Sequence, residues 1–236
     1  MNPTTISRLL ELNRQFYQTF ALPFSATRRR LQPGVLRILT QISPTANLLD
    51  LGCGNGELRR ELARRGYAGS YTGLDFSPSL LEHARVNQAP NCEFHLADLS
   101  NPSWDTMLAG RQFDCILAFA VLHHLPGSDL RLQIFRKVRA LLIPGGRFIH
   151  SEWQFLNSPR LASRVQPWES IGLTDSDVDP GDYLLDWRQG GKGLRYVHHF
   201  SEPELEQLAA SSSFTIIESF LSEGKNGRLG LYQVWG

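Results

Sequence analysis

Apolar and polar positions along residues 46–152 alternate between strand-like and helix-like patterns. Short strand-like runs occur at 46–51, 69–75, 92–97, 113–121 and 147–152. The run at 113–121 is almost continuously apolar, as in a strand buried on both faces. Helical spacing and helix caps predict helices between these strands, at 56–66, 78–87 and 128–142. This alternation predicts a parallel sheet covered by helices on both faces.

Two flanking regions differ from this pattern. Residues 1–43 are expected to form a helical N-terminal cap, and residues 44–236 are expected to form the main domain. Within that domain, 153–195 breaks the β/α rhythm with three prolines and a glycine-rich run, so we expect an insertion or lid there.

The C-terminal part returns to regular elements. Ser201 and Glu204 predict a capping box at the start of a helix over 202–211. Residues 214–221 and 228–235 then predict a closing pair of strands around a glycine-containing turn.

Composition excludes several protein classes. The chain has 236 residues, of which 42% are hydrophobic and 20% charged, so it can bury a core and is neither disordered nor a disulfide scaffold. Its three cysteines show no CxxC spacing, so we expect neither a disulfide framework nor a metal site. No secretory signal and no apolar run of membrane-spanning length is visible, so we expect a cytoplasmic protein without a membrane partner.

Charge is nearly balanced overall but not along the chain. The formal net charge is +1, which indicates no global preference for a polyanion. Residues 1–40 nevertheless hold six arginines and one acid, a net charge of +5 on that segment. Three of these arginines are consecutive, at 28–30.

The clearest candidate site is a glycine loop followed by acids at two strand ends. Asp50 precedes the GxGxG sequence of 52–56, where the first strand meets the first helix. Asp75 ends the second strand, where a carboxylate can accept hydrogen bonds from both ribose hydroxyls. Asp98 follows the third strand, and with the Leu99 N–H it can pair with the amine and ring nitrogen of an adenine. Each feature alone is more often an ordinary turn or a solvated acid, but together they predict a nucleoside-containing ligand at the carboxyl edge of the sheet. The GxGxG spacing disfavours a dehydrogenase.

Five ordered motifs resemble those of the class I S-adenosylmethionine-dependent methyltransferases. They are LDLGCGNG at 49–56, GLD at 73–75, AD at 97–98, FDCILAFAVLHHL at 113–125 and LLIPGG at 141–146. The resemblance implies an α/β, Rossmann-like fold with a seven-stranded, mostly parallel sheet whose last strand is antiparallel. It also implies S-adenosylmethionine as the cofactor. The residues expected to bind it are Tyr17, Arg28, Asp50, Gly52, Cys53, Gly54, Asp75, Phe76, Ser77, Asp98, Leu99, Ala118 and Phe119.

A second resemblance concerns the acceptor. The N-terminal FYxxxAxxFSxTR pattern, which runs from Phe16 to Arg28, is similar to that of the eukaryotic-type tRNA carboxymethyluridine methyltransferases. This implies methylation of a carboxylate on a wobble uridine, with tRNA as partner. Two alternatives stay open: a small-molecule acceptor, or a non-catalytic S-adenosylmethionine-binding module that activates a partner. A requirement for a small activating subunit also stays open.

The chemistry limits which side chains are needed. A sulfonium methyl group is already activated, and a carboxylate acceptor is ionised at neutral pH, so no general base is required. His123 follows the fourth strand, and Tyr196 and His198 follow the insertion, so all three are candidate catalytic residues. Their alternative role is hydrogen bonding within the framework.

Further residues are candidates for binding the acceptor. Arg28 is expected to bind the methionyl carboxylate or a substrate anion. Arg29 and Arg30 are expected to contact phosphate or to form a solvated face. Base stacking is assigned to Trp153, Trp168 and Trp187, for which core packing is the alternative.

Overall fold

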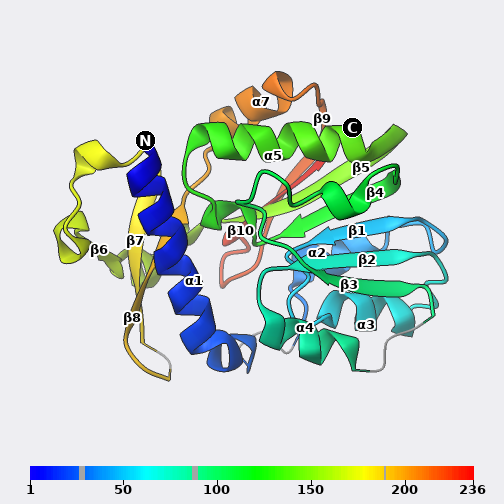
Figure 1. Cartoon of the computed structure of the whole chain (residues 1–236), viewed down its shortest axis with the longest axis horizontal. Helices are drawn as coiled ribbons and strands as arrows, with labels where there is room; N and C mark the ends of the chain where they lie inside the picture. The colour runs from blue at the N-terminus through cyan, green and yellow to red at the C-terminus, as the bar shows by residue number, and fades with distance from the viewer. Residues whose placement is uncertain (27–29, 87–89, 189) are drawn as a thin grey trace.

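A seven-stranded sheet forms the centre of the computed structural model, which describes residues 1–26, 30–86, 90–188 and 190–236 (Figure 1). The strand order is β3-β2-β1-β4-β5-β10-β9. The strands are β1 (Leu48–Leu51), β2 (Tyr71–Asp75), β3 (Cys92–Leu96), β4 (Phe113–Phe119), β5 (Leu142–Trp153), β9 (Ile216–Ser222) and β10 (Gly230–Trp235).

Strand directions confirm the predicted topology. Strands β3, β2, β1, β4 and β5 are parallel to one another, whereas β10 lies antiparallel between β5 and β9. The segment predicted as the last strand, 228–235, is therefore the antiparallel one. All the strand ends that carry the predicted site residues meet at one edge of the sheet.

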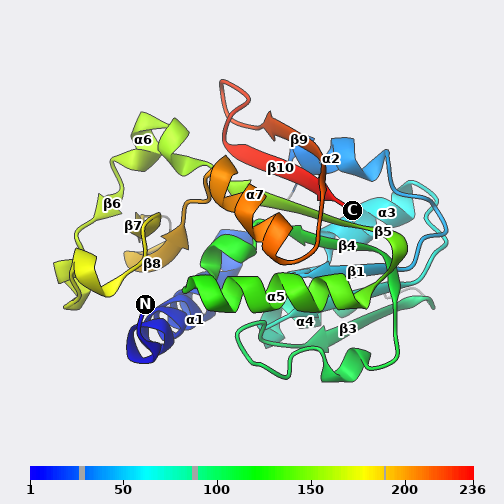
Figure 2. The same ribbon diagram turned by 90° about the horizontal axis from the view of Figure 1, so that it is seen from above.

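Helices cover both faces, as the alternation predicted (Figures 1 and 2). On one face lie α5 (Ser128–Leu141) and α7 (Glu202–Ser211), which pack Phe135 and Leu205 into a core with Leu49 of β1. On the other face lie α2 (Pro33–Leu39), α3 (Glu57–Arg64) and α4 (Pro78–Arg85), whose apolar side chains pack with Leu48. Because successive residues of β1 point to opposite faces, this short strand contributes to both cores.

Strand β5 begins earlier than the sequence predicted. Leu142 already pairs with Phe113, and the register then shifts so that Arg147 pairs with Cys115. The segment Pro144-Gly145-Gly146, which precedes the predicted strand 147–152, is therefore a bulge inside β5, where Gly145 adopts a φ of +78°.

A second, smaller sheet lies beside the main one. It contains β6 (Val165–Gln166), β7 (Asp182–Trp187) and β8 (Gly193–His198), all antiparallel. The short helix α6 (Pro159–Ala162) precedes it. This sheet lies almost entirely within the segment 153–195 that was expected to be an insertion or lid, and its last strand extends three residues beyond 195.

The long helix α1 (Pro3–Ala26) packs along β8, on the side of the small sheet that faces the core domain (Figure 1). Leu9 of α1 is fully buried against Leu184 and Tyr196 of the small sheet. We refer to α1 and the β6–β8 sheet together as the cover. In the part of the chain that the structure describes, no helix has the length and hydropathy of a membrane span.

Candidate cofactor and acceptor site

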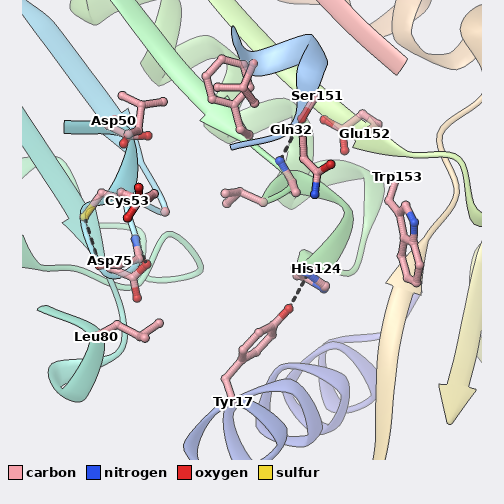
Figure 3. Close-up of a pocket in the computed structure, with 18 of the residues that line it drawn as sticks. Tyr17, Gln32, Asp50, Cys53, Asp75, Leu80, His124, Ser151, Glu152 and Trp153 are labelled. Carbon is pink, nitrogen blue, oxygen red and sulfur yellow. Dashed lines mark hydrogen bonds between the residues drawn. The ribbon is translucent and has the colours of Figure 1, made fainter. Parts of the chain in front are cut away.

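A cavity of about 430 Å³ opens at the carboxyl edge of the parallel strands, beneath α1 (Figure 3). Its size is in the usual range for small-molecule sites. Asp50, Cys53 and Asp75 lie on one side of it, and Glu152 and Trp153 on the other (Figure 3). We call these sides the cofactor half and the acceptor half.

The glycine loop shapes the cofactor half. Gly52 and Gly54 adopt φ values of +74° and +55°, which disfavour other residues. A Cβ atom at Gly52 would lie 2.3 Å from Val121, whereas Gly54 faces open space. The N–H groups of Gly52 and Cys53 donate to the Leu74 carbonyl, at 2.7 and 2.9 Å, and so fix the loop to β2. The loop therefore presents backbone to the cavity at Gly54.

Asp75 is held by the backbone of the two loops around it. Its Oδ2 accepts a hydrogen bond from the Gly54 N–H at 2.8 Å, and its Oδ1 accepts one from the Ser77 N–H at 2.9 Å. Burial raises the pKa of Asp75, and these two amides oppose the rise. Each oxygen keeps a second lone pair for a ligand hydroxyl, so the geometry fits a ribose diol.

Asp50 lies deeper in the cofactor half. It is 3% exposed, and the Tyr71 hydroxyl donates to its Oδ2. Burial raises the pKa of Asp50 to about 7; the Tyr71 hydrogen bond opposes the shift and the nearby Asp75 charge adds to it. A ligand ammonium group next to it would favour the ionised form.

Asp98 lies where the geometry can receive an adenine. Its Oδ1 accepts hydrogen bonds from the Ser100 N–H at 2.9 Å and the Ser100 hydroxyl at 2.6 Å. Its Oδ2 accepts one from Arg14 of α1 at 2.9 Å. Among the described residues, the Leu99 N–H has no hydrogen-bond acceptor. A carboxylate oxygen and an N–H are therefore adjacent at the cavity, as pairing with an adenine edge requires.

Most of the residues expected to bind the cofactor line this cavity. They are Tyr17, Asp50, Gly52, Cys53, Gly54, Asp75, Phe76, Asp98, Leu99 and Phe119. Two do not. Ser77 accepts a hydrogen bond from the Leu80 N–H as the N-cap of α4, and Ala118 points away from the cavity into the core beneath α5 because strand neighbours face opposite sides. Arg28 and Arg29 lie outside the described residues.

Of the two adjacent histidines, His124 lines the cavity and His123 does not. Consecutive side chains diverge in the 3₁₀ turn η2 (Leu122–His124). His124 Nε2 and the Tyr17 hydroxyl are hydrogen-bonded at 2.6 Å across the cavity (Figure 3). His123 is 1% exposed, with its Nδ1 3.2 Å from Glu152 Oε2. His123 therefore does not line the cavity itself but contacts Glu152, which does, so its expected catalytic role stays a prediction.

Tyr196 and His198 make framework hydrogen bonds, the alternative role that the sequence left open for them. Both are fully buried and outside the cavity lining. The Tyr196 hydroxyl donates to Asp182 Oδ1, and His198 bridges Asp182 at 2.6 Å and Glu204 at 2.9 Å. Burial lowers the pKa of His198, but these two carboxylates outweigh the effect and leave its pKa raised. The cluster connects the cover to α7, and it explains why Glu204 does not complete the predicted capping box with Ser201.

The tryptophans expected to stack on bases divide in the same way. Trp153 lines the cavity, whereas Trp168 and Trp187 are each 6% exposed in apolar clusters beneath α1.

The sequence predictions missed several lining residues: Asn13 and Arg14 of α1, Gln32, and Ser151, Glu152 and Tyr232 of the central strands. Leu10, Asn13, Arg14 and Tyr17 follow helical spacing, which marks the α1 face toward the cavity.

Comparison with known proteins agrees with this site. The Methyltransferase domain family matches residues 24–219. The tRNA (carboxymethyluridine(34)-5-O)-methyltransferase of Schizosaccharomyces pombe is 29% identical over 221 residues, which cover 86% of this chain and 89% of that protein. The trans-aconitate 2-methyltransferase of Escherichia coli is 37% identical over 152 residues, but these cover 63% of this chain and 55% of that enzyme.

A solved structure extends the comparison to three dimensions. The 1,6-didemethyltoxoflavin-N1-methyltransferase of Burkholderia thailandensis, solved with S-adenosylhomocysteine, covers 100% of this chain and 90% of its own at a TM-score of 0.66 and 21% identity. At that identity the similarity concerns the fold. Together with the glycine loop and the carboxylates at the strand ends, the family match shows that the chain belongs to the Methyltransferase domain family and is an S-adenosylmethionine-dependent methyltransferase.

Proposed function

We propose that the protein transfers the methyl group to a carboxylate oxygen, and that the acceptor is a carboxymethyluridine in tRNA. The observation that carries this proposal is the similarity to the S. pombe enzyme over 221 residues. An alignment of that length extends well beyond the cofactor-binding segment at 44–150 and includes regions that contribute to the acceptor half.

The acceptor half supports an anionic acceptor with a planar base. Trp153 offers an aromatic ring on its wall, and the Tyr17–His124 pair offers hydrogen-bonding groups. Arg30 lines the cavity and is exposed, and within the described residues its guanidinium has neither an ion-pair nor a hydrogen-bond partner. A cation at this position is available to bind a carboxylate or a phosphate.

S-adenosylmethionine supplies an activated methyl group on a positively charged sulfur. The protein's own contribution is then to position the acceptor and exclude water, for which α1 and the acceptor-half walls are suited. A carboxylate acceptor loses its charge on methylation and releases no proton. The proposal therefore assigns positioning roles to Tyr17 and His124 and requires no general base.

A small carboxylic acid is the second candidate acceptor. It is favoured by the higher identity, 37%, to trans-aconitate 2-methyltransferase over the shorter aligned segment. The two candidates share the bond that forms, an ester oxygen–methyl bond, and differ in the size and charge of the acceptor.

Labelled methyl transfer tests the proposal. The acceptors are tRNA containing carboxymethyluridine, the same tRNA with unmodified uridine, and a panel of small di- and tricarboxylates. We expect label only in the carboxymethyluridine tRNA, in a form released by mild alkali as an ester would be. The assay is run with the chain alone and in cell extract, so that a need for an activating subunit is detected. Transfer only to small carboxylates would identify the second candidate instead.

A further inference from the structure

The ion pair between Arg14 and Asp98 joins the cover to the cofactor half. Arg14 Nη2 lies 2.9 Å from Asp98 Oδ2, and Arg14 Nη1 lies 2.7 Å from Glu11 Oε2. The side chains of Arg14 and Asp98 are 40% and 36% exposed. Ion pairs this exposed typically contribute about 0–1 kcal/mol to folding, so stability alone gives little reason for this contact.

The adjacent residue fixes the position from which Arg14 reaches into the cavity. Asn13 is 5% exposed, and its side chain binds both backbone groups of Tyr196 in β8, at 2.8 and 3.1 Å. Its Nδ2 also donates to the His124 carbonyl at 3.1 Å. The backbone of α1 is therefore anchored to β8 and to η2, and Arg14 projects over Asp98 from a defined place.

The hydrogen bonds of Asp98 leave one place for a ligand. Ser100 occupies Oδ1 with two donors, whereas Oδ2 accepts only from Arg14 among the described residues. Oδ2 thus has a lone pair for the exocyclic amine of an adenine, next to the Leu99 N–H. A planar guanidinium beside this position is also suited to lie against an aromatic ring.

We propose that Arg14 is a cofactor-binding residue that orients the Asp98 carboxylate for the adenine amine and closes α1 over the adenine end of the cavity. The inference concerns the cofactor, so it holds whichever acceptor is methylated. It makes α1 part of the cofactor site and not only a wall of the acceptor half.

A double-mutant cycle tests this proposal. The dissociation constant of S-adenosylhomocysteine is measured by calorimetry for the wild type, Arg14→Gln, Asp98→Ala and the double variant. We expect Arg14→Gln to weaken binding by about 5- to 20-fold in the wild-type background, less than the loss of a charged ligand hydrogen bond, because Asp98 itself remains to accept from the adenine. In the Asp98→Ala background the same change should alter binding by less than about twofold, because its partner is already missing.

A matched control separates this role from a general effect of surface charge. Arg37 of α2 forms a similarly exposed ion pair with Glu218 of β9. Arg37→Gln should leave the affinity unchanged. If Arg14→Gln proves poorly folded, Arg14→Lys is the substitute test. It keeps the charge and should bind with an affinity between those of the wild type and Arg14→Gln. Binding within twofold of wild type in a folded Arg14→Gln protein would overturn the proposal, as would an equal loss in both backgrounds.

A truncated ligand locates the effect. 5′-Methylthioadenosine has the adenine and ribose but lacks the amino-acid end. Arg14→Gln should weaken its binding by the same factor as for S-adenosylhomocysteine. A loss restricted to S-adenosylhomocysteine would place the action of Arg14 at the amino-acid end and contradict the adenine assignment.

Discussion

Asp75 and Asp50 are both buried carboxyl groups of the cofactor half, yet the protein holds them differently. Both oxygens of Asp75 accept backbone N–H groups, which come from rigid loops on either side. Among the described residues, Asp50 has one side-chain hydrogen-bond donor, the Tyr71 hydroxyl. Asp75 is consequently a fixed hydrogen-bond acceptor, whereas the charge of Asp50 depends on conditions near neutral pH.

Replacement of Asp75 should weaken cofactor binding. Asp75→Ala removes both acceptors proposed for the ribose hydroxyls, and hydrogen bonds to a charged group contribute about 1.5–3 kcal/mol. We expect a loss of about 10- to 100-fold in S-adenosylhomocysteine affinity by calorimetry. Because the change also leaves the Gly54 and Ser77 amides unpaired, Asp75→Asn serves as a milder second variant. Unchanged affinity in either folded variant would disprove the ribose assignment.

From the raised pKa of Asp50 we predict how the free energy of unfolding changes with pH. The pKa lies near 7 in the folded state, above the ordinary aspartate value of 3.8, so the folded protein binds the extra proton between these values. This contribution to stability is present at about pH 4 and is lost as pH rises toward 7. Asp50→Asn should remove this loss, which is at most about 1.4 kcal/mol per pH unit. Urea unfolding of both proteins from pH 4 to 8 measures it, and parallel pH profiles would contradict it.

Residues at strand ends could be placed at the cavity from the sequence. Asp75 and Asp98 were identifiable because strand ends converge at one edge of a parallel sheet. Arg14 was not, because its partner Asp98 is 84 residues away and the contact depends on the path of α1. The choice between His123 and His124 depends on a 3₁₀ turn, and nothing in the histidine pair itself indicates which side chain faces the cavity.

Among the elements, α1 owes its place to both apolar and polar contacts. Leu9 is buried against the small sheet, and Phe16 packs edge-on against Trp187 at 5.6 Å between ring centroids. Asn13 adds directional hydrogen bonds to the backbone of β8 in the middle of this apolar face. The apolar residues bury the helix, and Asn13 sets its position along β8.

Replacement of Asn13 should therefore destabilise the protein more than replacement of an exposed neighbour on the same helix. Asn13→Ala leaves the Tyr196 N–H and carbonyl without these partners in a buried setting, which costs about 1–3 kcal/mol. Gln15→Ala, on the exposed side of the same helix, is the control and should change stability by less than about 0.5 kcal/mol. The free energies of unfolding in urea measure both. Equal effects of the two changes would show that Asn13 does not anchor α1.

Elements with strong periodicity were predictable, and those shaped by tertiary contacts were not. The strands and helices of the core were found from the alternation of 46–152, with β5 lengthened because its glycines form a bulge. The strands of the small sheet were not predicted, since Pro167, Pro180 and the glycines near 191 interrupt any pattern. Their pairing is supported by buried contacts such as those of Tyr196, which binds Asp182 within the sheet and Asn13 of α1, 183 residues away.

On the scale of the whole molecule, the cavity lies between the cover and the core domain. Tyr17–His124 and Arg14–Asp98 connect these parts across it. A ligand that contacts both sides should hold them together more firmly than these two contacts do alone.

Hydrogen exchange tests this expectation. With S-adenosylhomocysteine present, residues 10–17 of α1 should exchange more slowly than without it, because opening the cover would then also break contacts to the ligand. Strand β9, at the far edge of the sheet, is the internal control and should not change. Equal protection of residues 10–17 in both states would rule out a role for α1 in closing the site.

The distribution of charge predicts how salt affects the proposed tRNA reaction. The net charge is only +1, but residues 1–40 carry +5, and Arg30 of this segment lines the cavity. If the acceptor is tRNA, its affinity should fall as salt rises, with a slope of log affinity against log salt of about −0.7 for each phosphate contact in a single-stranded region.

Arg30→Gln should reduce the magnitude of that slope by about 0.7 and leave S-adenosylhomocysteine affinity unchanged. Arg65→Gln is the matched control, because Arg65 at the end of α3 is exposed but paired with Glu61, and neither residue lines the cavity. The Michaelis constant for carboxymethyluridine tRNA, measured from 50 to 200 mM salt, provides the test. A constant that does not depend on salt would contradict the tRNA assignment and favour a small carboxylate, with the methyltransferase activity unaffected.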